Sequence, residues 1–285
     1  MASKMGLVCT LTFYFLLNIS TYLIMASIND NFYTDFSIFY HFSLIFLCCF
    51  SFYLLLQIKK RGPGIIEKNS KGSFSIDENI INNNETKTIS LSNSPLVISK
   101  SDLLFSENCD MCNIWNLPLR SHHCKKCGIC VLKFDHHCSF ISTCIGENNH
   151  LNFIIFLFFQ SIAIFLALYG LFKTIHLFFD NNKNSNYRDI PASIFFLIFI
   201  LIFFCGYCSI LFLFHVYLVC TNQTTYEIFH QEKCPYLKIF KVERNKILTE
   251  RAIEVKPTFA YHPFDSGISN NLKLLIENFI EIIIK

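Results

Sequence analysis

Seven cysteines and four histidines fall within 36 residues, from Cys109 to Cys144. The cysteines include three Cys-x2-Cys spacings, which begin at Cys109, Cys124 and Cys127. Such a turn brings two sulfurs to one metal ion, and structural zinc takes four Cys or His ligands in a tetrahedron. Six cysteines and two histidines would fill two sites of this kind. The sequence therefore predicts two structural zinc ions and leaves one thiol over.

The segment Asp135-His136-His137-Cys138 is the place where a left-over thiol would meet an acid and a base. Successive side chains of an extended segment point to opposite sides, so His136 and Cys138 would share one side and His137 the other. If His137 binds zinc, His136 is free to take the proton of Cys138. A carboxylate that orients the imidazole completes the arrangement of an activated nucleophile. The chain must bend at Asp135 for this, and spacing alone leaves open that Cys138 replaces another metal ligand.

The composition indicates a membrane protein. Of the 285 residues, 52% are hydrophobic and 33 are Phe. Four stretches without Asp, Glu or Arg are long enough to cross a bilayer, which takes about 20 residues. They run roughly over 5–27, 36–57, 151–179 and 192–219. We therefore expect an α-helical polytopic protein with four transmembrane helices, although the first stretch has the alternative of a cleaved signal peptide.

Basic residues predict the orientation of these spans. The segment from Lys59 to His150 holds eleven Lys or Arg and the tail after Cys220 holds nine, whereas the connector 28–35 holds none. Both polar segments, and with them both termini, are expected in the cytosol. A reducing compartment keeps thiols free, which favours metal binding over disulfides. The net charge of +3 suits anionic lipid headgroups, and nothing in the sequence indicates nucleic acid.

The order of these features predicts five regions. Residues 1–57 hold spans one and two, and 58–108 form a flexible cytosolic linker rich in Asn and Ser. The cysteine-rich catalytic module covers 109–150, spans three and four cover 151–219, and 220–285 form a cytosolic tail. The last segment of the tail, from Leu272 to Lys285, is apolar but too short to span. We expect it to lie in the membrane interface or to pack on the zinc module.

These motifs together resemble the Asp-His-His-Cys family of protein S-acyltransferases, or palmitoyltransferases. Pro118-Leu119-Arg120, Asn149 and Phe153 also match the family pattern. Thr224-Thr225-Tyr226-Glu227 matches its Thr-Thr-x-Glu motif, and Asn271 lies in a C-terminal motif between Tyr261 and Leu274. Four spans with a cytosolic cysteine-rich loop between the second and third also match. The similarity extends over nearly the whole chain.

The resemblance implies a role for each site residue. One zinc would be held by Cys109, Cys112, His123 and Cys130, and the other by Cys124, Cys127, His137 and Cys144. Cys138 would be the acylated nucleophile, His136 its base and Asp135 the residue that orients the base. Thr225 would hydrogen-bond near Asp135, and Asn271 would brace the span ends. The co-substrate would be a long-chain acyl-CoA such as palmitoyl-CoA. The acceptors would be cysteines of membrane-associated proteins, at the Golgi or endoplasmic reticulum by family default.

Several positions depart from the family pattern, and the gap from Cys112 to Pro118 is one residue longer than expected for the family. Ser139-Phe140 stands where Pro-Trp is usual, Thr143 where Asn is usual, and Leu272 where Trp is usual. An inactive family member is therefore one alternative to the enzyme. A membrane-anchored zinc scaffold and a RING-like ubiquitin ligase are others. The left-over thiol of Cys138 argues against the scaffold and the ligase, because neither needs a cysteine outside its metal sites.

Overall fold

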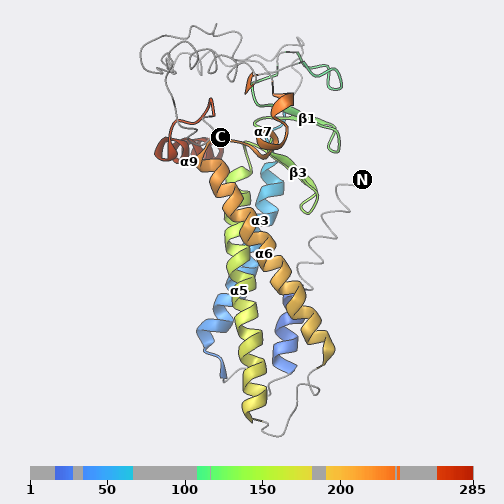
Figure 1. Ribbon diagram of the computed structural model, residues 1–285, viewed down its shortest axis with the longest axis vertical. Coiled ribbons are helices and arrows are strands. Elements are labelled where there is room, and N and C mark those ends of the chain that lie inside the picture. The colour runs from blue at the N-terminus through green and yellow to red at the C-terminus, as the bar shows by residue number, and fades with distance from the viewer. Residues whose placement is uncertain are drawn as a thin grey trace, which may run out of the picture.

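Three long helices form the body of the protein. A computed structural model of the chain describes residues 17–27, 35–66, 108–115, 117–181, 191–234, 236–237 and 262–284. In it, α3 (Ile38–Arg61), α5 (His150–Asn181) and α6 (Ala192–Cys220) are long and apolar enough to cross a membrane. They run side by side, and the cysteine-rich module sits at one end of the bundle (Figure 1). The bounds agree with the second, third and fourth predicted spans within a few residues.

The first predicted span is described only in part. Residues 17–27 form a short apolar helix, and 1–16 lie outside the described residues. Within the helix, Met25 and Thr21 are buried, and Met25 belongs to the same apolar cluster as Tyr40 of α3 and Leu171 of α5. This segment therefore packs on the bundle, while a fourth complete span remains a prediction. The connectors 28–34 and 182–190 and most of the predicted linker, 67–107, also lie outside the described residues.

Helix α5 is the centre of the bundle, since it contacts both α3 and α6 and is the most buried of the three. The faces turned outward are apolar as well, for example Phe196, Phe199 and Phe203 on α6, which are 65%, 68% and 60% exposed. Large exposed apolar surfaces are unfavourable in water but favourable against lipid. The described helices thus have the surface of a membrane protein.

The cysteine-rich module consists of two small antiparallel hairpins. The first pairs β1 (His122–Cys124) with β2 (Ile129–Val131), and the second pairs β3 (His136–Cys138) with β4 (Thr143–Ile145). Each strand has three residues. Strands this short bury little apolar surface, so bound metal is the expected source of their stability.

The second hairpin packs against the ends of α3 and α5 and is hydrogen-bonded to them. Ile141 and Ile145 are fully buried in one apolar cluster with Leu55 and Ile58 of α3. The Asn149 side chain donates to the carbonyls of Ile58 and Cys144 and accepts from the amide of Gly146. Residues 62–66, at the start of the predicted linker, also lie against the module, since the Ile66 amide donates to the Cys130 carbonyl at 3.0 Å. The module is therefore held directly on the membrane helices.

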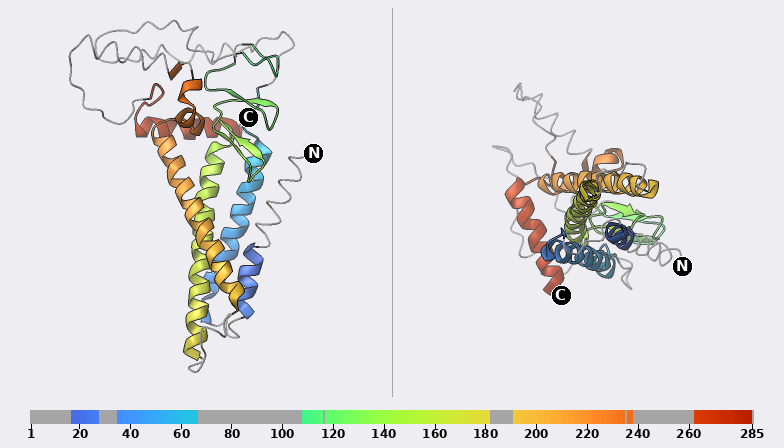
Figure 2. Two further views of the ribbon diagram at one scale, coloured as in Figure 1. Left: turned by 45° about the vertical axis from the view of Figure 1, so that its right-hand side comes forward. Right: turned by 90° about the horizontal axis from the view of Figure 1, so that it is seen from below.

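The segment after α6 returns to the module. Helix α7 (Thr225–Phe229) begins with a capping box in which Thr224 and Glu227 satisfy each other's backbone amides, and the 3-10 turn η2 (Gln231–Lys233) follows. Helix α9 (Ile268–Ile284) lies across the end of the bundle and contacts α6 (Figures 1 and 2). It begins four residues before the predicted interfacial segment. The Asn271 side chain donates to the Cys220 carbonyl at 2.7 Å, so it holds the end of α6.

Candidate functional site

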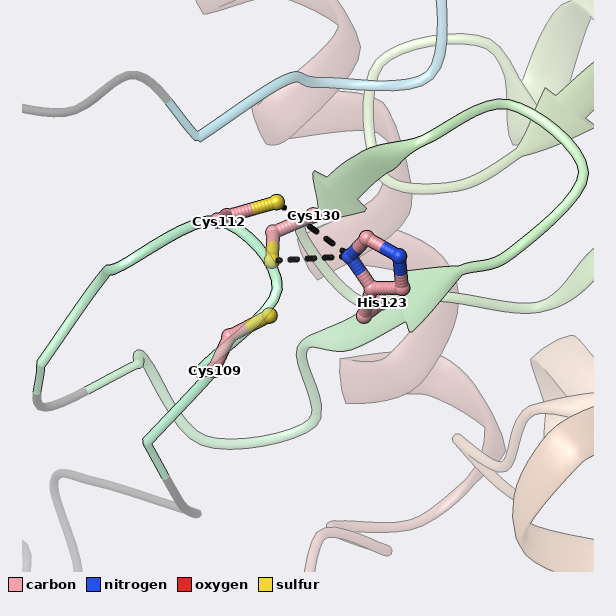
Figure 3. Close-up of side chains that lie close together, drawn as sticks. All are labelled: Cys109, Cys112, His123 and Cys130. Atoms are coloured by element: carbon pink, nitrogen blue, oxygen red, sulfur yellow. Dashed lines mark hydrogen bonds between the residues drawn. The ribbon is translucent and has the colours of Figure 1, made fainter.

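The first group of metal-binding side chains comes from the loop before β1 and from the first hairpin. Figure 3 shows Cys109, Cys112, His123 and Cys130 converging, and their ligand atoms lie within 4.8 Å of one another. His123 and Cys130 face each other across β1 and β2. Nδ1 of His123 is 3.2 Å from Sγ of Cys112 and 3.8 Å from Sγ of Cys130 (Figure 3). This is the set expected for the first zinc.

The second group links the two hairpins. It contains Cys124, Cys127, His137 and Cys144, again with all ligand atoms within 4.8 Å of one another. His137 and Cys144 are cross-strand partners on β3 and β4. Nδ1 of His137 lies 3.6 Å from Cys124, 3.3 Å from Cys127 and 3.7 Å from Cys144, each measured to Sγ. His123 and Cys124 are neighbours on β1 but belong to different groups, so the two sites are interleaved along the chain.

Both groups fit a tetrahedral zinc ion. Bond lengths of about 2.3 Å to sulfur and 2.0–2.1 Å to nitrogen separate neighbouring ligand atoms by roughly 3.5 to 3.8 Å. The distances given above scatter around that range. Burial, with the neighbouring thiols, raises the pKa of Cys130 and of Cys144. Thiols so placed become thiolates when a cation compensates their charge, which agrees with a metal-binding role.

Cys138 is the one cysteine between Cys109 and Cys144 that belongs to neither group. On β3 it points to the same side as His136, while His137 between them points to the second metal group. The Cys138 thiol interacts electrostatically with His136, and Nδ1 of His136 lies 2.7 Å from Oδ2 of Asp135. Asp135 precedes the strand, so it is not bound by the alternation and can reach His136. The structure thus brings the three predicted catalytic residues together.

Asp135 is held by α7 as well as by His136. The Thr225 amide donates to its Oδ1 and the Thr225 hydroxyl to its Oδ2, both at 2.8 Å. Burial opposes the charge of this carboxyl, but the hydrogen bond from His136 and the electrostatic interactions with His150, His215 and His136 together outweigh burial and keep the Asp135 pKa below its usual range. Burial also opposes a charged His136, yet the hydrogen bond to Asp135 and the electrostatic interactions with Asp135 and Cys138 raise the His136 pKa to about 9. The pair is therefore suited to an imidazolium next to a carboxylate.

An ion pair that the sequence reasoning did not identify joins the module to α7. Nε and Nη2 of Arg120 donate to the two oxygens of Glu227 at 2.7 and 2.8 Å. The two side chains are only 9% and 2% exposed. Arg120 also donates to Asn222 and stacks over Phe264. Both residues were noticed as parts of motifs, but nothing in their spacing of 107 residues says that they pair.

Two buried histidines also meet at this end of the bundle. His150 opens α5, and His215 lies near the end of α6. Nε2 of His150 is 3.0 Å from Nδ1 of His215, and the His215 ring centroid is 5.7 Å from that of His136. Polar side chains in apolar membrane helices commonly hydrogen-bond a neighbouring helix. The structure has that bond and places it next to Asp135 and His136.

The departures from the family pattern leave these contacts in place. Ser139 accepts a hydrogen bond from Lys126 at 3.4 Å, and Phe140 is 37% exposed. Thr143 is the cross-strand partner of Cys138 on β4. None of these three supplies a metal-binding group or touches Asp135 in the contacts described here.

The helices and the site together define a membrane protein with a cysteine-rich DHHC domain. Residues 104–232 match the family described as DHHC palmitoyltransferase, so this part of the chain is a domain of that family. The putative ZDHHC-type palmitoyltransferase 7 of Dictyostelium discoideum is 37% identical over 176 residues, which are 59% of this chain and 34% of that protein. Palmitoyltransferase ERF2 of Kluyveromyces lactis is 29% identical over 225 residues, 73% of this chain and 54% of that protein.

A plant relative, the probable protein S-acyltransferase 7 of Arabidopsis thaliana, is 32% identical over 184 residues, 62% of this chain and 41% of that protein. The chain therefore spans between about a third and about a half of the length of these relatives. The likeness concerns the cysteine-rich domain and the neighbouring helices.

Proposed function

We propose that this protein is a protein S-acyltransferase that moves a long-chain acyl group, palmitoyl by the resemblance, from acyl-CoA to cysteines of membrane-associated proteins. The observation that carries the proposal is the position of Cys138. It is the one thiol between Cys109 and Cys144 that lies outside both metal groups, and it lies next to an imidazole that is held by a buried carboxylate. The names of the relatives, palmitoyltransferase and protein S-acyltransferase, support the same activity.

In this proposal the chain carries out two thioester exchanges. Since Asp135 occupies Nδ1 of His136, Nε2 faces the thiol and takes its proton. The Cys138 sulfur attacks the carbonyl carbon of the acyl-CoA, the bond from that carbon to the CoA sulfur breaks, and CoA leaves with the proton from His136. The thiol of the acceptor protein then gives its proton to His136, attacks the acyl-Cys138 carbonyl and releases Cys138. Each step exchanges one thioester for another, so positioning matters more than driving force.

The two zinc ions would be structural. Each group offers three sulfurs and one nitrogen, which fill a tetrahedron and leave no position for water or substrate. The second zinc would hold His137 and Cys144, and through them the register of the hairpin that carries His136 and Cys138. Zinc would therefore act on the reaction by fixing the backbone on which the nucleophile sits.

The membrane arrangement belongs to the same proposal. The module, α7 and α9 lie at one end of the helices, and we place that end and both termini in the cytosol on the basis of the Lys and Arg distribution. The acyl chain would then lie among the apolar helices with its thioester at Cys138. Acceptor cysteines would approach along the membrane surface. The Golgi or endoplasmic reticulum remains the expectation from the family resemblance.

Acyl loading tests the proposal. Purified, zinc-loaded protein is incubated with a labelled palmitoyl-CoA analogue and then treated with neutral hydroxylamine, which cleaves thioesters. We expect label that hydroxylamine removes and that is absent in Cys138→Ser. Cys220→Ser is the matched control, because this cysteine also lies near the membrane end but outside the site, and it should load normally. Zinc-loaded wild type without label would refute the enzyme and favour a scaffold or an inactive member. Label that persists in Cys138→Ser would refute the nucleophile.

A further inference from the structure

The buried histidine pair lies directly behind the Asp135–His136 pair. A ring nitrogen of His215 lies within 4.8 Å of both a carboxylate oxygen of Asp135 and a ring nitrogen of His136. His215 and Asp135 are each 2% exposed, and His150 is 8% exposed. Phe153 packs edge-on against both His136 and His215. The His136 ring is therefore in contact with Phe153 and His215 as well as bound by Asp135.

Asp135, His136 and His215 are close enough together to hold a metal ion, but several of their polar atoms already take part in hydrogen bonds. Both oxygens of Asp135 accept from Thr225, one of them also from His136, and Nδ1 of His136 is the atom in that bond. Nδ1 of His215 is in contact with His150. A metal would have to displace hydrogen bonds that the Asp135 oxygens already accept, so a positioning role agrees better with the contacts.

The bond between the two histidines limits their tautomers. Of two neutral imidazole nitrogens that share a hydrogen bond, one must donate and the other accept. If His215 accepts at Nδ1, its own proton is on Nε2 and can face the charge of Asp135. The opposite arrangement would leave Nε2 without a proton to offer the buried carboxylate, which is electrostatically less favourable. The carboxylate therefore selects the form in which His150 Nε2–H donates to His215 Nδ1.

We propose that His215 is a positioning residue of the Cys138 site. It presents its Nε2–H to the Asp135–His136 pair and packs against the His136 ring, so that the imidazole stays turned toward the thiol. His150 fixes the tautomer that makes this possible. The inference rests on the proposed acyl transfer, and it assigns a part in that reaction to α5 and α6, outside the cysteine-rich module.

Three substitutions of His215 in the full-length protein test this role. The amide nitrogen of Gln can occupy the place of Nε2, that of Asn only the place of Nδ1, and Leu offers neither. Single-turnover loading of Cys138 is measured over a range of labelled palmitoyl-CoA concentrations. We expect His215→Gln to stay within a few-fold of wild type. His215→Asn and His215→Leu should lose roughly 10- to 100-fold in maximal rate, the size expected for a misplaced reacting group.

Two readouts separate positioning from a merely structural role. The palmitoyl-CoA concentration at half-maximal rate should not change, and each variant should keep two zinc ions. His176→Leu is the matched control, since His176 also lies on a long apolar helix but is exposed and far along α5 from the site. It should load like wild type.

Several results would overturn the inference. These are wild-type rates in zinc-loaded His215→Leu, equal losses in the Gln, Asn and Leu variants, or a changed half-maximal concentration with an unchanged maximal rate. A third zinc that disappears in His215→Leu would replace it with a metal site. If wild type itself does not load, the proposed function fails, and the rate of Cys138 alkylation by iodoacetamide, mapped by peptide mass, still ranks the variants. Alkylation rates that are close to wild type in the Gln variant and changed in the Asn and Leu variants would retain the positioning role. Equal alkylation rates in all variants would refute it.

Discussion

Loss of the Arg120 guanidinium should detach α7 from the cysteine-rich module. In Arg120→Met, the unbranched stem is kept over Phe264, and the positive φ of 68° at this residue is easier for Met than for a β-branched side chain. Glu227 would stay buried with the amide of Thr224 and the hydroxyl of Tyr236 but without its cation. Breaking a buried pair from one side costs about 3 to 5 kcal/mol. A change of about 1.4 kcal/mol is tenfold in an equilibrium constant, so the equilibrium constant for local opening of α7 should rise roughly 100- to 4,000-fold.

Hydrogen exchange measures this opening without unfolding the whole protein. The amides of Ile228 and His230 donate to the carbonyls of Thr224 and Tyr226, so their exchange reports whether α7 is formed. We expect the large increase in exchange rate for Arg120→Met. For the double variant Arg120→Met/Glu227→Met, the change in the free energy of opening should be smaller than the sum of the two single effects, because the double variant leaves no uncompensated charge. The coupling should be about 2 to 3 kcal/mol.

An exposed pair provides the control. Lys273 and Glu277 are 3.6 Å apart on α9, with side chains 73% and 52% exposed. Pairs of this kind contribute little, so Lys273→Met should change exchange of α7 no more than about twofold. If Arg120→Met raises exchange less than about threefold, or if the two single effects simply add, the Arg120–Glu227 pair does not hold α7 on the module and the reasoning is wrong.

The other predictions concern the same end of the molecule. Gly146→Ala should destabilise the module and reduce bound zinc, because its Cβ would lie 2.5 and 2.8 Å from the carbonyl oxygens of Pro63 and Leu132. Gly206→Ala is the control: its Cβ would have no atom within 4 Å, so this variant should keep two zinc ions. Thr225→Val should slow acyl loading by roughly ten- to a hundredfold, since a hydrogen bond to a charged group is worth about 1.5–3 kcal/mol, and Thr225→Ser should restore most of the rate. Cys109→Ala and Cys144→Ala should each bind fewer than two zinc ions, as measured by metal analysis. Removal of zinc by a chelator should abolish acyl loading of Cys138. Loading that survives complete zinc removal would contradict the role of the metal.

Local patterns in the sequence were sufficient for the helices and for the composition of the metal groups. Long uncharged apolar runs predict helices in a membrane, and α3, α5 and α6 lie where those runs lie. Alternation along an extended segment predicts that His136 and Cys138 share a side, and β3 has that geometry. The division of the ligands between two sites came from the family resemblance rather than from spacing, because several pairings of cysteines satisfy the same spacings.

Contacts between distant segments were the part that the sequence did not reveal. Thr225 and Asp135 are 90 residues apart, Arg120 and Glu227 are 107 apart, and His150 and His215 are 65 apart. Periodicity tells which face of an element is apolar, but it does not tell which polar group on one element meets which on another. His215 illustrates this, since a single histidine in an apolar run gives no sign of the carboxylate beside it.

The position of Asp135 shows why the module needs the helices. The second metal group can hold His137 and Cys144, and the strand pairing then fixes the side on which His136 and Cys138 stand. Asp135 lies just before the strand, and although its amide donates to the Ile145 carbonyl at 3.0 Å, its carboxylate is held by contacts outside the hairpin pairing. The direction of the carboxylate comes from Thr225 of α7, and α7 is itself held by Arg120 and Glu227. In the proposed mechanism the nucleophile is therefore placed by metal, while its base is oriented by a segment that follows the last membrane helix. A module released from the bundle would keep its zinc and its thiol but lose the alignment of Asp135 and His136.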